Sequence, residues 1–279
     1  MPKFEDHEYR SLEEFRTAIG AFHGVCGLLL FAFAKQDCDT KNLLIRNFIA
    51  RTDVMLRGVL QLWDVADFQD CWILNRCLLD RLFHLIHLGE TGSHGLFDDW
   101  SFCEQYKAQN RVRSDPEFRD ALKSELFTPS PKEKSRFNEL SKSPPKWERP
   151  MAEVIAKRRN LSFLYRYGYD FGSTHVHPMA NDGQQDFFSI TKLEPSPNFP
   201  DQRSVISNSI LIGCMIVQEG LNQSSFRWRR VVYDFLDHLM GHLHDGTPGY
   251  QLTFLKIAKM AQEMELSEPT EHVPGEGAA

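Results

Sequence analysis

Apolar residues recur every three to four positions over most of the chain, which is the spacing of amphipathic helices. Apolar and polar residues nowhere alternate for long enough to build a sheet. Signals for the starts and ends of helices fit this pattern. Ser11 and Glu14 have the spacing of a capping box, which marks a helix start, and Asp67 precedes a helical run that Gly89 ends. The pattern predicts helices over about 11–36, 41–65, 68–88, 96–113, 116–127, 151–167, 204–221, 226–243 and 251–264.

Long helices with short connections favour an antiparallel arrangement. The expected fold class is therefore all-α, a multi-helix antiparallel bundle with a long Pro-rich loop and a disordered C-terminal tail. Residues 128–150 are rich in Pro, Ser and Lys, which suits a mobile surface excursion around one short helix. Residues 181–202 hold three prolines after the β-like run FFSIT, which predicts a long loop that could cover a site. We expect one helical domain over 1–264 and a disordered tail over 265–279.

Composition narrows the classes of function. With 279 residues, of which 42% are hydrophobic, the chain can form a substantial buried core. A net charge of -6 argues against coating nucleic acid by bulk electrostatics, so any such role must come from a local site. The six cysteines form no CxxC pair and are typical of small buried residues in a reducing compartment. The N-terminus is charged and lacks an apolar leader, which indicates a cytoplasmic protein.

One segment raises the alternative of a membrane anchor. Residues 17–34 are nearly all apolar and flanked by charges, at the lower edge of membrane-spanning length. His23 and three glycines in this segment weaken the signal. We expect a buried core helix and no membrane partner.

The third predicted helix carries an ionisable stripe on an otherwise apolar surface. Helical spacing places Arg76, Asp80, His84 and His87 in one narrow arc. One interpretation is an ordinary solvated face with a weak ion pair between Arg76 and Asp80. The other is a binding site formed by Arg76, Asp80 and His84, since burying such a pair is costly unless it is paired or serves a site.

A second polar concentration lies in the run YRYGYDFGSTHVHP. On a continuous helix, one face within about 100° of arc would hold Arg166, Tyr169, Asp170, Ser173 and His177. These residues offer hydroxyl donors, a base near neutral pH and a guanidinium for phosphate. They are equally consistent with a structural polar network, and Gly168 and Gly172 would dissolve the shared face if they break the helix.

Metal and nucleotide motifs are otherwise missing from the sequence. His175 and His177 form an HxH, and His238 and His242 lie one turn apart, but there is no HExxH and no convergent acidic ligand. Neither a P-loop, a GxGxxG nor a GxSxG is present. The basic run at 226–230 is more typical of a solvated helix start than of a phosphate site. We expect no metal and no cofactor.

The run Tyr169, Ser173, His177, Pro178 resembles the Tyr-x-x-x-Ser-x-x-x-His-Pro element of an uncharacterised bacterial all-helical family of unknown function. An Arg-x-x-x-Asp/Glu helix precedes that element in the family, as 76–80 does here, and the likeness spans about 40–245. The family is similar to HEPN-type proteins, helical bundles that often act as metal-independent ribonucleases in toxin and phage-defence systems. Those enzymes use an Arg and a His about four to six residues apart, whereas ten residues separate Arg166 from His177.

The resemblance implies a metal-independent endoribonuclease or a nucleotide-acting protein, with RNA or a nucleotide as partner and a homodimer as the assembly. Its catalytic residues would be His177 as general base or acid, Arg166 or Arg76 for phosphate charge, and Tyr169 and Ser173 for orienting the substrate. The alternative is a non-catalytic helical domain that binds a small ligand or a protein through the same residues.

Overall fold

The computed structural model describes residues 11–35, 38–65, 67–117, 128–177, 179–180, 183–192, 203–226, 228–247 and 249–267, and these residues form helices and no strand. The predicted all-α class is confirmed. The elements are α1 (Leu12–Ala34), α2 (Thr40–Asp64), α3 (Phe68–Thr91), α4 (His94–Ser114), α5 (Pro131–Lys142), α6 (Ala152–Arg158), α7 (Ser162–Leu164), the π-helix η2 (Tyr165–Asp170), α8 (Phe171–Thr174), α9 (Gln184–Thr191), α10 (Arg203–Gln223), α11 (Arg229–Asp245) and α12 (Tyr250–Ser267).

Local capping explains where the first helices begin and end. The Ser11 hydroxyl accepts a hydrogen bond from the Glu14 amide, and the Glu14 carboxylate accepts one from the Ser11 amide, so the predicted capping box is present. Asp67 caps α3 as expected. The predicted end of α3 at Gly89 is wrong. The helix continues to Thr91, because Gly92 is the residue that adopts the left-handed conformation (φ 64°).

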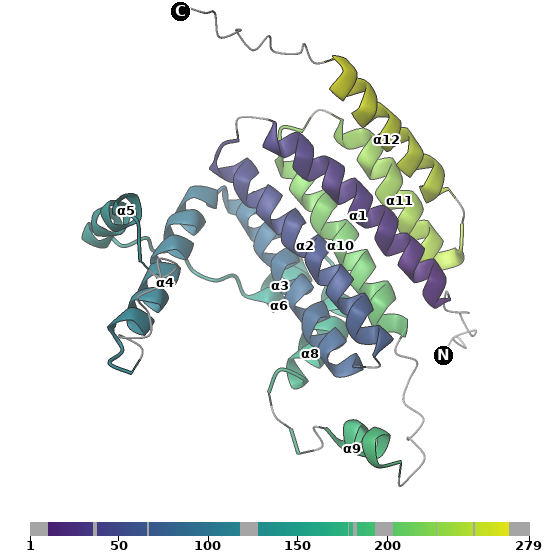
Figure 1. Cartoon of the computed structure of the whole chain (residues 1–279), viewed down its shortest axis with the longest axis horizontal. Coiled ribbons are helices and arrows are strands. Elements are labelled where there is room, and N and C mark those ends of the chain that lie inside the picture. The colour runs from purple at the N-terminus through teal and green to yellow at the C-terminus, as the bar shows by residue number, and fades with distance from the viewer. Residues whose placement is uncertain are drawn as a thin grey trace, which may run out of the picture.

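The core forms where α1, α2, α3 and α10 pack together, while α12 packs against α1, and α11 packs against α10 and α12 (Figure 1). Both α1 and the stretch Ser204–Gln223 of α10 are long and apolar enough to cross a membrane. Core helices of soluble proteins meet the same criterion, and both helices bury residues in this core, such as Phe22 and Ile210. Their composition is therefore weak evidence for a membrane span.

Helices α4 and α5 project from one side of the bundle (Figure 1). The single short helix expected within 128–150 is present as α5, where Ser130 forms a second capping box with Glu133. The segment after α5 returns to the bundle and buries Trp147, which is 7% exposed. The segment 128–150 is thus held against the bundle at its C-terminal end by Trp147.

Two further sequence-based assignments are wrong. Residues 151–167 do not form one helix but are divided among α6, α7 and η2, with Asn160 at φ 58° between the first two. The FFSIT run lies in α9 rather than in an extended segment, since no neighbouring strand is available to pair with it among the described residues. The predicted loop is therefore helical at 184–191. The helix predicted over 116–127 falls almost entirely on 118–127, which lies outside the described residues, as do 193–202 of the predicted loop. The predicted tail over 265–279 begins too early, because α12 extends to Ser267, and its remaining residues 268–279 lie outside the described ones.

Candidate functional site

Two glycines let η2 and α8 approach α3 closely. A Cβ atom on Gly172 would lie 2.9 Å from the backbone oxygen of Trp72 and 2.8 Å from Cβ of Arg76. A Cβ atom on Gly168 would lie 2.5 Å from the side chain of Leu79. All three distances are shorter than normal van der Waals contact. At position 172 a side chain would meet atoms that cannot turn aside, whereas at position 168 the end of the Leu79 side chain would have to move. These residues do not merely interrupt a helix, because they bring the two polar concentrations of the sequence into contact.

A polar network joins the two segments across this contact. Nε of Arg76 donates a hydrogen bond of 2.8 Å to the Ser173 hydroxyl, which donates one of 2.6 Å to the Tyr169 carbonyl. The Arg76 guanidinium also lies 4.7 Å from the centre of the Tyr169 ring. The Tyr169 hydroxyl donates a long hydrogen bond of 3.5 Å to Asp80. Four of the predicted site residues are therefore neighbours.

Arg166 and His177 lie outside this network. The continuous helical face expected for them does not form, because the wider turn of η2 carries Arg166 away from Tyr169 and α8 ends at Thr174, before His177. Both side chains are exposed. The expected geometry at these two positions is wrong, while their proposed catalytic roles remain proposals.

His84 extends the network one turn further along α3. Its Nδ1 lies 2.7 Å from the Asp80 carbonyl oxygen, which can only accept, so Nδ1 carries a proton and Nε2 is left as an acceptor. Burial lowers the pKa of His84, and the positive charge of Arg149 adds to this effect, although both the backbone and the carboxylate of Asp80 oppose it. Near neutral pH His84 is therefore a neutral imidazole.

Asp80 and His84 line a cavity of about 320 Å³, which we call the arginine pocket. Burial lowers the pKa of the Arg81 guanidinium, whose Nη1 donates a 2.8 Å hydrogen bond to the Cys77 carbonyl, and nearby Arg51 adds to the shift. Arg51 and Arg149 line the same pocket, so three guanidinium groups face one described carboxylate, that of Asp80. The pocket therefore has an excess of positive charge. Among the described residues, the lining consists of Asn47, Phe48, Arg51, Asp80, Arg81, His84, Phe97 and Arg149.

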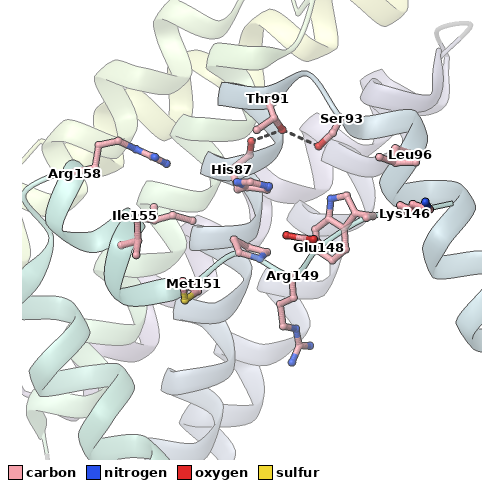
Figure 2. A pocket seen from close by; sticks show the side chains of 13 residues that line it. His87, Thr91, Ser93, Leu96, Lys146, Glu148, Arg149, Met151, Ile155 and Arg158 are labelled. Carbon is pink, nitrogen blue, oxygen red and sulfur yellow. Dashed lines mark hydrogen bonds between the residues drawn. The ribbon is translucent and has the colours of Figure 1, made fainter.

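A second cavity of about 460 Å³, the Trp147 groove, lies beside the arginine pocket. Arg149 lines both cavities, and the Trp147 ring lies 5.7 Å from that of His84 and 6.3 Å from that of His87. Figure 2 shows His87, Thr91 and Ser93 on one wall of the groove, with Met151 and Ile155 on another. Arg149 is therefore common to the linings of both cavities.

Sequence reasoning missed the three pocket arginines. Arg51, Arg81 and Arg149 come from α2, α3 and the segment before α6, so no local motif contains any two of them. A local signal that could have found Arg149 is Trp147, because a large aromatic residue in a Pro-rich and Lys-rich stretch is typical of a buried anchor. As for metals, no group of three or more His, Cys, Asp or Glu that could hold an ion is found among the described residues.

The fold and the site define an all-α bundle whose central helix carries a polar network and an arginine-lined pocket. A family model described as "Family of unknown function (DUF5677)" matches residues 42–191, and the chain belongs to this family. The match runs from the first turn of α2 to the end of α9 and so includes every residue of the network and the pocket. Neither a curated protein nor a solved structure matches the chain. The expected membership of a family of unknown function is confirmed, while the bacterial origin and the likeness to HEPN-type proteins stay proposals.

Proposed function

We propose that the protein binds a phosphate-bearing ligand, a nucleotide or RNA, in the arginine pocket. One observation carries this proposal: Arg51, Arg81 and Arg149 line a single cavity in which, among the described residues, Asp80 is the one acidic residue. The planar guanidinium matches phosphate oxygens through paired hydrogen bonds. Because the whole chain has a net charge of -6, the attraction for an anion is local to this pocket.

The surroundings of the pocket suit the rest of a nucleotide. Phe48 and Phe97 are half-buried, line the pocket and offer ring surfaces on which a base can stack. The cavity volume of about 320 Å³ lies in the range of small-molecule sites. The Trp147 groove continues from Arg149 and has room for a second nucleotide of a single strand. The free cysteines fit the cytoplasmic location that we propose with this function.

Replacing a pocket arginine is expected to weaken binding strongly. A charge-assisted hydrogen bond contributes about 1.5–3 kcal/mol, so Arg149→Met should raise the Kd roughly tenfold to a hundredfold, and Arg81→Met should do the same. The measurement is a calorimetric titration with AMP, ATP and a short single-stranded RNA in EDTA. Arg111→Met, which removes an exposed arginine of α4 remote from the pocket lining, is the matched control and should bind as wild type. Wild-type protein that binds none of the three ligands would refute the proposal.

A second candidate function, metal-independent RNA cleavage, is favoured by the state of His84. Its neutral ring presents Nε2 as a proton acceptor, and the residue lines the same pocket as the arginines. With RNA in the pocket, the 2′-oxygen would attack the adjacent phosphorus as Nε2 takes its proton. The bond from phosphorus to the 5′-oxygen would break, and that oxygen would leave as a hydroxyl after taking a proton from solvent water, with the arginines stabilising the phosphoryl charge. The toxin or phage-defence role implied by the HEPN likeness belongs to this candidate.

Cleavage assays on His84→Ala and His177→Ala separate the two histidines. If His84 is the base, its loss should lower the rate about 10²–10⁴-fold in EDTA, whereas an equal loss in His177→Ala would support the assignment made from the sequence. Burial places the pKa of His84 below its ordinary value of 6.5, so the wild-type rate should persist below pH 6.5 and fall as acid protonates Nε2. Wild-type protein that cleaves no RNA would remove this candidate and leave the binding proposal intact.

A further inference from the structure

Three exposed aromatic rings form a stacked row along η2 and its flanks, which we call the aromatic ladder. Phe163 and Tyr167 lie 5.4 Å apart with an interplanar angle of 8°, and Tyr167 and Phe171 lie 6.4 Å apart at 14°. The wide turn of η2 places residues four apart almost directly above one another, which allows these parallel rings. Trp72 of α3 supports the row edge-on, at 5.7 Å from Tyr167 and 5.0 Å from Phe171.

The ladder is too exposed to be part of the core. Phe163 is 70% exposed, while Tyr167 and Phe171 are 44% and 45% exposed. Since each aromatic side chain presents about 150–250 Å², the ladder leaves on the order of 300 Å² of ring surface in water. Helix α6 contacts η2, but its exposed Val154 and the preceding Met151 line the Trp147 groove and are not counted in the ladder. A patch of about this size is often functional, but it is less than half of the roughly 800 Å² that each partner of a standard interface buries, so the dimer should be weak and concentration-dependent.

Charges beside the ladder indicate which partner fits. Arg166 and Asp170 are both exposed and carry opposite charges four residues apart. They form no ion pair with each other in the described part of the chain, and the Tyr165 hydroxyl hydrogen-bonds Asp170. Arg166 already lies near the carboxylate of Glu153. An antiparallel copy of the same helix would bring Asp170 beside Arg166 and Arg166 beside Asp170, adding one opposite charge to the surroundings of each. The surface is therefore complementary to itself, as a twofold interface requires.

We propose that the aromatic ladder is the contact between two copies of this chain, which pair antiparallel about a twofold axis close to Tyr167. In this arrangement Phe163 packs against Phe171 of the second copy, and two ion pairs between Arg166 and Asp170 flank the rings. The exposed apolar area supplies the affinity, and the charges select the antiparallel register. The inference rests on the surface alone and holds whether or not the arginine pocket binds phosphate.

Charge reversal tests the pairing by sedimentation velocity. Arg166→Asp and Asp170→Arg should each raise the dimer dissociation constant about tenfold or more, because each puts like charges opposite one another twice. Mixing the two variants should restore dimers, since every contact then joins opposite charges. The double variant R166D/D170R should also restore them for the same reason.

A matched phenylalanine controls for a general loss of surface hydrophobicity. Phe163→Ser should abolish dimers, while Phe187→Ser should not, because Phe187 is 52% exposed but lies on α9 outside the ladder. Circular dichroism checks that each variant remains folded. Wild-type protein that stays monomeric at high micromolar concentration would overturn the proposal, and so would dimers that neither single charge reversal weakens. Dimers lost equally in both phenylalanine variants would also contradict it.

Discussion

Replacing Gly172 with alanine is expected to destabilise the protein by about 3 kcal/mol, at the upper end of the usual cost of overpacking. The added Cβ would lie 2.9 Å from the backbone oxygen of Trp72 and 2.8 Å from Cβ of Arg76. Neither atom is the flexible end of a side chain, so α3 and α8 must separate. That movement would also break the 2.8 Å hydrogen bond between Arg76 and Ser173. Urea unfolding of both proteins measures the loss.

Gly27→Ala is the matched control for this change. Gly27 also lies in a helix, but no atom lies within 4 Å of the Cβ position there. Alanine at such a site should stabilise the protein by about 0.5–1 kcal/mol, since glycine loses more conformational freedom on folding. If Gly172→Ala proved as stable as Gly27→Ala, the close packing of α8 on α3 would be wrong, and with it the network that joins Arg76 to Ser173.

Replacing Trp147 with alanine is expected to remove about 3–5 kcal/mol of packing free energy. The indole is 7% exposed and lies 4.7 Å from the ring of Phe97 and 4.8 Å from that of Trp100. It anchors the segment that carries Arg149 into the arginine pocket. The loss should therefore appear as faster hydrogen exchange across 143–151 and as weaker nucleotide binding, in addition to a lower Tm.

Trp147→Phe separates packing from hydrogen bonding at this position. The indole Nε1 is buried and has no hydrogen-bond partner among the described residues. Phenylalanine therefore gives up part of the ring volume and no hydrogen bond, so its stability loss should be clearly smaller than that of alanine. Unchanged exchange and binding in Trp147→Ala would show that the 143–151 segment holds Arg149 in place without this anchor.

The sequence predicted well wherever a structure depends on nearby residues. The capping box of Ser11 with Glu14 and the cap at Asp67 were found because a cap involves residues three positions apart. Grouping Arg76 with Asp80 and Tyr169 with Ser173 succeeded for the same reason, since each pair lies one turn apart on a helix.

Prediction failed where a helix departs from regular geometry. The prediction that Arg166, Tyr169 and His177 share one helix face assumed 3.6 residues per turn. The π-helix η2 departs from that period between 165 and 170. Arg166 consequently points away from Tyr169 and, in our proposal, toward a second copy of the chain. The end of α8 at Thr174 likewise removes His177 from the face on which its role was argued.

By itself the sequence determined the all-α class, most helix positions and the two polar segments, because hydrophobic period and caps act over one or two turns. Only the tertiary structure decided that Gly172 brings these segments together, and that Arg51, Arg81 and Arg149 surround one cavity. The physical reason is that a pocket depends on which surfaces of distant helices meet. Which surfaces meet depends on the packing of the whole core, so it cannot be predicted from any short stretch of residues.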